Sequence, residues 1–247
     1  MTTGRLFGRA RHFQPPPDVN WDVSTSGYVR PHLATPEFLD DAGQVIPYGE
    51  RWGDDRPPDD TYSVVSHPER FALLIDVANT MIEFLTSTYN ITASDVPHLE
   101  DEREPRFPGT KEPRFTDTCG PTFLRAIKLT PQGPDEAPLV IGFTDFPGIL
   151  LWAGAFFESV IPQCGCDACD EDWTHCADEF ESTVLAVVNG TFSESWHGRR
   201  LVTNYSYPDG GSGSTSQAKY LPYSAPYIAK ARNRLRDLPH GWQPWTR

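Results

Sequence analysis

Residues Phe143–Cys176 read FTDFPGILLWAGAFFESVIPQCGCDACDEDWTHC, and the predicted elements of the chain are arranged around them. The stretch begins with apolar runs typical of strands and ends where a helical pattern starts. Four of the five cysteines lie in its last thirteen residues, with the spacing C-x-C-x-x-C-x6-C. We therefore expect any chemistry of this protein to occur here, beside the elements that form its core.

Strand patterns surround this stretch. Phe123–Thr130 alternates in polarity, and Leu139–Phe143 and Ile149–Phe157 are richer in apolar residues, with turn-forming connections between the three. Farther along, Glu194–Tyr207 and Ser214–Leu221 flank the turn sequence PDGGSG, which indicates another hairpin. These short connections predict antiparallel pairing.

Three segments carry a helical pattern. The first follows Ser66, which is placed to cap a helix with Glu69 in a capping box, and the other two are predicted at about Glu171–Val188 and at Pro226–Arg236. The first helix has one apolar stripe, made of Phe71, Leu74, Ile75, Ala78, Ile82, Leu85 and Tyr89. The order of elements predicts an α+β fold, with an antiparallel sheet of about five strands and three main helices packed on it.

The N-terminal part has a different composition. Residues 1–60 contain eight prolines and little periodicity, which predicts an irregular, extended arm. Its scattered aromatic residues favour an arm that wraps over the body of the protein. We therefore divide the chain into an arm, residues 1–60, and one α+β domain, residues 61–247. Residues 92–118 are acidic and rich in proline, and we expect them to form a surface loop.

Composition excludes some classes of function. The formal net charge is −13, whereas nonspecific binding to nucleic acid needs clustered Lys and Arg. The N-terminal residues show no apolar run typical of a signal peptide, and the longest apolar stretch, Gly148–Phe157, is shorter than the ~20 residues that span a bilayer. We expect a cytoplasmic protein that binds neither nucleic acid nor membrane.

In a reducing compartment, clustered cysteines are more typical of metal ligands or free thiols than of disulfides. Cys164, Cys166 and Cys169 lie in one short loop, and Gly165 permits the tight turn that brings thiolates together around Zn²⁺. The sequence therefore predicts a structural zinc site with these three ligands.

The fourth ligand stays open. Cys176 follows Cys169 by seven residues, roughly 10 Å of helix rise, and it lies on the apolar stripe of the second helix, which favours a buried core thiol. His175, Cys119 or a carboxylate from Asp167 or Asp170 would serve instead.

Two other interpretations of the cysteines compete with the metal site. In one, the thiols are free and packed without a metal. In the other, Cys166 and Cys169 carry out thiol redox chemistry at a helix N-terminus, where the helix dipole favours a thiolate. Asp167, Asp170 and Glu171 weaken this second interpretation, because neighbouring anions raise the pKa of a thiol.

Three motifs resemble those of an uncharacterised actinobacterial family known only as a domain of unknown function. They are FTDFPG at Phe143–Gly148, CGCDACDE at Cys164–Glu171 and DLPHGWQPW at Asp237–Trp245. The resemblance implies a bacterial, intracellular protein, and it brings no catalytic residues with it.

The sequence contains no Gly-x-Ser-x-Gly, no phosphate-binding loop and no His-Glu-x-x-His. We therefore favour a non-enzymatic module, of an accessory or immunity type, that binds a protein partner. The rival hypothesis is a zinc hydrolase in which the loop thiolates hold the metal and Asp145 or His175 activates water. A third hypothesis is a small-molecule binder with a pocket lined by Trp152, Phe156 and Trp196.

Overall fold

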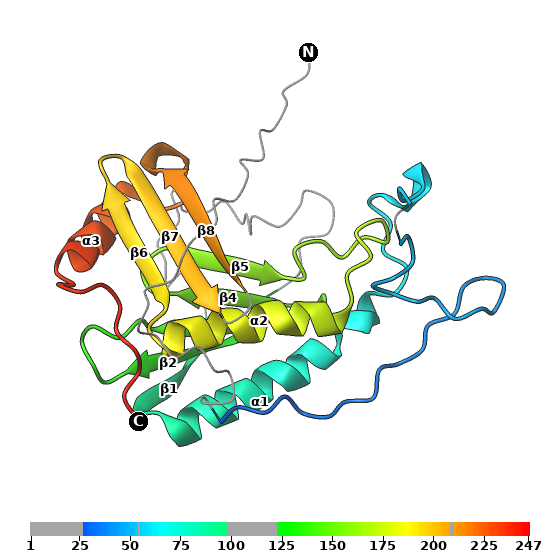
Figure 1. Cartoon of the computed structure of the whole chain (residues 1–247), viewed down its shortest axis with the longest axis horizontal. Coiled ribbons are helices and arrows are strands. Elements are labelled where there is room, and N and C mark those ends of the chain that lie inside the picture. Colours follow the sequence, from blue (N-terminus) through cyan, green and yellow to red (C-terminus); the bar gives the residue numbers. More distant parts are fainter. Residues whose placement is uncertain (1–26, 54, 98–122, 208–209) are drawn as a thin grey trace, which may run out of the picture.

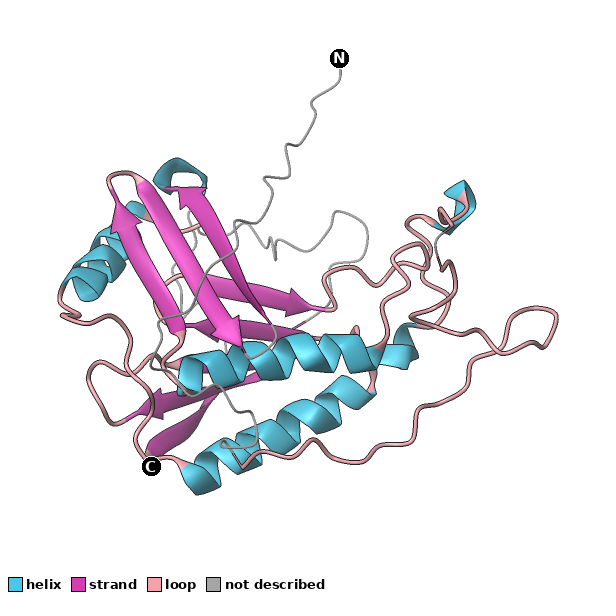
Figure 2. Cartoon of the chain, viewed as in Figure 1, coloured by secondary structure: helices cyan, strands magenta, loops and turns pink. Residues whose placement is uncertain are grey.

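The structure is a computed structural model, and it describes residues 27–53, 55–97, 123–207 and 210–247 (Figure 1). Cys119 and residues 1–26 lie outside these ranges. The described residues form an α+β fold of three main helices and two antiparallel sheets (Figure 2), which confirms the predicted fold class.

The larger sheet has five strands in sequence order, each antiparallel to the next. They are β1 (Ile91–Val96), β2 (Phe123–Pro131), β3 (Leu139–Thr144), β4 (Ile149–Ala153) and β5 (Phe157–Ile161). Every residue of β3 is buried, as expected of the central strand of a five-stranded sheet. This sheet contains the meander that the sequence predicted.

Two predictions about this sheet were wrong. β1 overlaps the segment 92–118, which was predicted as a loop. Four of its six residues are exposed, so this edge strand shows no apolar alternation in the sequence. The single strand predicted at Ile149–Phe157 is instead the hairpin of β4 and β5. Its turn passes through Gly154, whose φ of 56° is in the left-handed region that glycine adopts without strain.

The smaller sheet has three strands, in the order β6 (Phe192–His197), β7 (Arg200–Tyr207) and β8 (Gly210–Gln217). The strand predicted at Glu194–Tyr207 is thus divided between β6 and β7, with a turn at Gly198 (φ 65°). These strands form a second sheet and do not extend the first.

The helices are α1 (Leu73–Thr88), α2 (Trp173–Val188) and α3 (Ala225–Arg236). Figure 1 shows α1 and α2 side by side, and both contact the five-stranded sheet, while α2 also packs against β7. The core at this junction consists of apolar side chains from all these layers, including the fully buried Leu74, Met81, Leu129, Ile141, Leu151 and Phe180.

One buried carboxylate joins the two sheets. Glu194 of β6 is 6% exposed and accepts hydrogen bonds from the backbone N–H groups of Ala155, Phe156 and Phe157 at 2.7–2.9 Å. It also accepts one from Nε1 of Trp242 at 3.0 Å. The second sheet, the β4–β5 turn and the C-terminal segment therefore share one charged acceptor.

The first described residues of the predicted arm lie against the helices. The ring of Tyr28 packs edge-on against Phe84 of α1, and its hydroxyl donates to Glu181 of α2 at 2.8 Å. Arg30 pairs with the carboxylates of Glu181 and Asp178, each at 2.5 Å. These contacts fix residues 28–30 on α1 and α2.

The helical stretch Pro68–Thr88 is long and apolar enough, by length and composition alone, to cross a membrane. Core helices of soluble proteins meet the same criteria. In this fold Leu74, Val77, Met81 and Leu85 of that stretch are fully buried in the core.

Candidate metal centre

The three cysteines predicted as ligands come together in the loop between β5 and α2. Their sulfur atoms all lie within 4.8 Å of one another, and Cys164 Sγ is 3.3 Å from Cys166 Sγ. Cys166 is buried, Cys164 is half-buried and Cys169 is exposed. Among the described residues, this is the cluster in which three metal-binding side chains converge.

These separations suit thiolates that share one metal ion. Two thiolates, each about 2.3 Å from Zn²⁺ at a tetrahedral angle, lie about 3.8 Å apart. The observed spacing brackets that value and exceeds the ~2.0 Å of a disulfide. The loop therefore presents its thiols at nearly the spacing that a soft divalent cation requires.

The three thiols differ in acidity. Burial acts to raise the pKa of Cys166, but hydrogen bonds from the Cys164 thiol and from the backbone N–H groups of Cys169 and Ser63 outweigh burial and lower that pKa. Burial raises the pKa values of Cys164 and Cys169, and their sulfur neighbours raise that of Cys169 further. One thiolate thus forms most readily, and a cation would be needed to deprotonate all three.

A buried arginine organises the backbone of the loop. Arg70, 2% exposed, donates from Nε to the carbonyl oxygen of Glu171 at 3.1 Å and from Nη2 to that of Gly165 at 2.9 Å. Its Nη1 also reaches the carbonyl oxygen of His67 at 3.1 Å. The planar guanidinium thereby connects the entry of α1 to both ends of the cysteine loop.

A buried aspartate makes the complementary contact. Asp167, between the cysteines, accepts hydrogen bonds from the backbone N–H of Ser66 at 3.2 Å and from its hydroxyl at 2.5 Å. Its carboxylate is 3.7 Å from Arg70 Nη1 and 4.0 Å from Arg51 Nη1. The predicted capping role of Ser66 was wrong: the structure shows no side-chain cap at this helix start, and the hydroxyl is committed to Asp167.

The segment from Arg51 to Val64 forms the opposite wall. The N–H of Asp167 donates to the carbonyl oxygen of Val64 at 2.7 Å, and that of Ala168 donates to Thr61 at 3.2 Å. Nε1 of Trp52 donates to the carbonyl oxygen of Asp167, and Asp170 accepts the N–H of Arg51. Residues about 100 positions away in the sequence thus hold the loop in one conformation.

The FTDFPG motif packs against the cysteine loop. Phe146 of this motif packs against Gly165, and a methyl group added at Gly165 would collide with the Phe146 ring. The same ring lies 5.8 Å, between centroids, from that of Phe71 at the start of the first helix. Close packing against Phe146 therefore favours glycine at position 165. The predicted need for glycine in a tight turn is not seen, because Gly165 is not among the residues with positive φ and the turn of the loop lies between Cys166 and Cys169.

Backbone strain and unpaired polar atoms concentrate around the cluster. Ser63 (φ 61°) and Asp170 (φ 52°) are the non-glycine residues with positive φ among those described, and left-handed backbone costs roughly 1–2 kcal/mol per residue. Of the buried side-chain atoms without a hydrogen-bond partner in the described chain, three belong to Tyr48, Arg51 and Asp170. Such features are typical of functional sites.

Most of the chain matches a known protein family. Residues 34–247 match the model of a family described as "Family of unknown function (DUF6226)". The chain belongs to this family. The match begins inside the segment that the sequence assigned to the arm, and it includes Arg51, Arg70 and the whole cysteine loop. Searches of curated proteins and of solved structures gave no significant match.

Among the described residues, none of the candidates for a fourth ligand belongs to the group whose ligand atoms all lie within 4.8 Å of one another. Cys176 is buried in the core, 4.0 Å from Glu171, and burial raises the pKa of its thiol. His175 is on the exposed side of α2, where Nδ1 contacts Asp172 at 3.0 Å. Asp167 and Asp170 are bound by arginines and backbone groups, and Cys119 lies outside the described residues.

Sequence reasoning missed the residues that hold the loop in place. Arg70 precedes Leu74 by one helical turn, so it occupies a core-facing position of the apolar stripe. This spacing could have predicted that Arg70 is buried. Ser63 and Arg51 gave no such signal, because their roles depend on contacts with a distant loop.

Proposed function

We propose that this protein is a non-enzymatic, metal-stabilised binding module in the cytoplasm. Cys164, Cys166 and Cys169 hold a structural Zn²⁺, and the surface that this centre stabilises binds a protein partner. The observation that carries the proposal is the convergence of the three sulfurs within 4.8 Å. Thiolate is the ligand that Zn²⁺ favours in structural sites. Such a site has four ligands, so one further group completes the shell beside these three cysteines.

The position of the cluster supports a structural role. The loop contacts the segment Arg51–Val64 on one side and Arg70 at the helix entry on the other. A cation bound to the thiolates would stabilise the folded state, in which all of these contacts form, because it binds that state and not the unfolded chain.

The adjacent surface supports a role in binding. Tyr62 and Val64 lie on the wall of the cysteine loop and are 48% and 44% exposed. The carbonyl groups of Thr61 and Val64 are bound to the loop, so this wall is rigid while its apolar side chains face solvent. Rigid, exposed apolar side chains favour a protein interface.

The hydrolase hypothesis has less support. Asp145 lies in the β3–β4 turn, where its carboxylate accepts the N–H of Phe146 at 2.8 Å, and His175 is held by Asp172. Neither group belongs to the cluster of three converging sulfurs found among the described residues.

Metal content tests the first half of the proposal. Protein purified without added metal should contain about one zinc per chain by elemental mass spectrometry. Cys166→Ser should lose most of it, whereas Cys176→Ala, which changes a core thiol outside the cluster, should retain it. A stably folded wild-type protein without metal would refute the metal centre and leave the free-thiol interpretation. A Cys166–Cys169 disulfide in mass spectra of the native protein would favour the redox interpretation.

Partner binding tests the second half. Tyr62→Ser and Cys166→Ser should both abolish capture of a partner from a cell extract, whereas Leu124→Ser should not. Leu124 is 60% exposed on β2, so Leu124→Ser also removes exposed apolar surface, but at a different place from Tyr62→Ser. Equal loss with Leu124→Ser, or no loss with Tyr62→Ser, would refute the assignment of this surface.

A further inference from the structure

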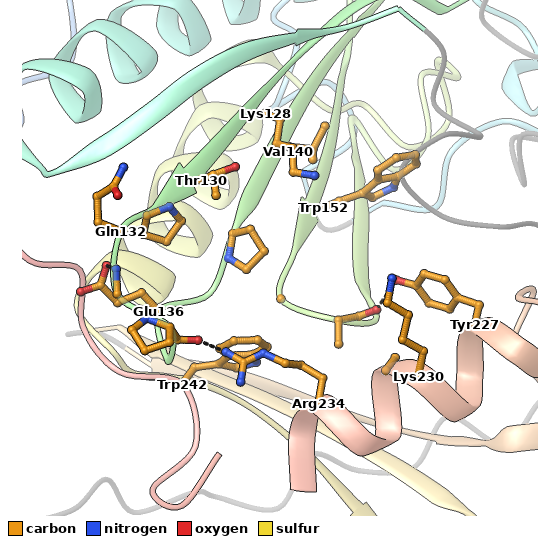
Figure 3. A pocket seen from close by; sticks show the side chains of 17 residues that line it. Lys128, Thr130, Gln132, Glu136, Val140, Trp152, Tyr227, Lys230, Arg234 and Trp242 are labelled. Atoms are coloured by element: carbon orange, nitrogen blue, oxygen red, sulfur yellow. Dashed lines mark hydrogen bonds between the residues drawn. The ribbon is translucent and has the colours of Figure 1, made fainter. Parts of the chain in front are cut away.

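A second site lies away from the cysteines, between α3 and the face of the five-stranded sheet that α1 and α2 do not cover. It is a groove of about 490 Å³, within the size range of small-molecule sites (Figure 3). One wall is formed by β2, β3 and β4, the other by α3, and the connection from β2 to β3 closes one end.

The sheet wall combines a cation with a large aromatic ring. Lys128, Val140 and Trp152 are direct partners across β2, β3 and β4, so their side chains rise from the same face. Trp152 is only partly buried, and with Val140 it gives this wall a flat apolar surface beside the Lys128 amine.

The helical wall adds two more cations. Tyr227, Lys230 and Arg234 are spaced at i, i+3 and i+7, which places them on one face of α3. The hydroxyl of Tyr227 donates to the carbonyl oxygen of Ala155 at 2.7 Å and ties the helix to the β4–β5 turn. Figure 3 shows Lys230 directed from the helix toward the sheet wall, whereas Arg234 extends toward Trp242 at the closed end of the groove.

Arg234 is fixed in place at the closed end of the groove. Its guanidinium lies over the Trp242 ring, 5.1 Å from the centroid, and it donates to the carbonyl oxygen of Pro134. Asp135 is 3.8 Å away and offsets part of its charge. A cation held in this way loses little conformational entropy when it binds an anion.

The charge of the groove is opposite to that of the chain. The described lining includes three basic side chains and one carboxylate, Glu136. Glu136 is 6% exposed, and its oxygens accept the N–H groups of Gly133 and Thr246, so backbone donors already solvate its charge. In a chain of net charge −13, such a group of cations favours an anionic ligand.

We propose that this groove binds a small aromatic anion, a molecule with a flat ring and one phosphate or carboxylate group. The ring stacks on Trp152 and Val140, and the anionic group is held by Lys230 and Arg234, with Lys128 at the opposite side. The sequence hypothesis of a pocket formed by Trp152, Phe156 and Trp196 is thereby revised. Phe156 and Trp196 pack against each other, 5.6 Å between ring centroids, and only Trp152 of the three is among the described lining residues.

Four probes separate the two halves of the proposal. Binding of 1-naphthyl phosphate and 1-naphthoate to the full chain is measured by equilibrium dialysis at low ionic strength, beside uncharged 1-naphthol and ring-free inorganic phosphate. Both aromatic anions should bind with Kd below about 1 mM, at least tenfold tighter than naphthol or phosphate, and 0.5 M NaCl should weaken their binding. The proposal would be overturned if neither aromatic anion bound detectably at 5 mM, or if naphthol bound with the same Kd as the two anions.

A matched pair of variants locates the site. Lys230→Glu should weaken binding of both aromatic anions at least tenfold. Arg236→Glu makes the same change in charge on the same helix, but its side chain is 75% exposed outside the groove and it should change Kd less than twofold. Equal effects of both substitutions would show that the general charge of the protein, and not this groove, attracts the anions, and would refute the site.

Discussion

Replacement of Arg70 by Lys tests the central claim about the cysteine loop, which is that a buried guanidinium fixes its backbone. Lysine keeps the positive charge near Asp167, but its single nitrogen cannot reach three carbonyl groups that are now bound by three different nitrogens of Arg70. One or two of these part-buried carbonyl groups would then lose their donor.

The expected cost follows from the loss of one or two hydrogen bonds. Each acceptor left without a partner costs roughly 1–3 kcal/mol, so Arg70→Lys should lower the free energy of unfolding by about 1–4 kcal/mol after partial relaxation. Arg70→Met also removes the charge paired with a carboxylate whose side chain is 5% exposed, and it should cost about 3–5 kcal/mol or more. Because a whole domain is stable by only about 5–15 kcal/mol, Arg70→Lys is the more informative variant.

Urea denaturation, followed by circular dichroism and by tryptophan fluorescence, measures this loss. Arg56→Lys is the matched control, because Arg56 is 77% exposed and its ion pair with Asp59 should contribute less than about 1 kcal/mol. Hydrogen exchange of residues 163–171 should accelerate in Arg70→Lys before global unfolding. A change in unfolding free energy below about 1 kcal/mol with unchanged exchange would refute the role given to Arg70.

Three further predictions concern the fold around the two sites. Glu194→Gln places an amide NH₂ against two of the four N–H donors that now bind a carboxylate, which should cost about 2–6 kcal/mol in urea denaturation. Gly165→Ala forces a methyl group against Phe146 and should cost about 1–3 kcal/mol, with a smaller cost in a Phe146→Leu background. Burial and the hydrogen bond to Glu181 raise the pKa of Tyr28, so the unfolded chain releases this proton first, above about pH 10. The stability that Tyr28 contributes should therefore be constant below pH 10 and fall above it, and Tyr28→Phe should show a shallower decline between pH 10 and 11.

Each of these predictions can fail in a distinct way. A Glu194→Gln variant as stable as the wild type would mean that the two sheets do not depend on a charged acceptor. Equal costs of Gly165→Ala with and without Phe146 would place the clash elsewhere. Parallel pH dependence of the wild type and Tyr28→Phe would show that the phenol is not protected in the folded state.

The candidate site was predictable only where its parts are close in sequence. Cys164, Cys166 and Cys169 span six residues, so the chain itself keeps their sulfurs near one another, and the turn between Cys166 and Cys169 brings them together. Arg70 and Arg51 reach the same loop from positions about 100 residues earlier. No local pattern of charge or spacing reports which distant carbonyl groups an arginine will bind.

The same limit explains the misassigned strands. β1 has mostly exposed side chains, so its sequence lacks the alternation that a half-buried strand shows, and only pairing with β2 makes it a strand. The apolar run from Ile149 was assigned to one strand because hydrophobicity does not mark the turn at Gly154, where the carboxylate of Glu194 binds the backbone.

The amino-acid sequence by itself determined the α+β class, the amphipathic helices and the three neighbouring thiols, because side-chain periodicity and short loops are local properties of the chain. The tertiary structure decided the division into two sheets, the fixed conformation of the cysteine loop and the cationic groove beside α3. Those features arise from hydrogen bonds, ion pairs and packing between distant segments, and the free energy of such contacts is realised only when the whole fold brings the segments together.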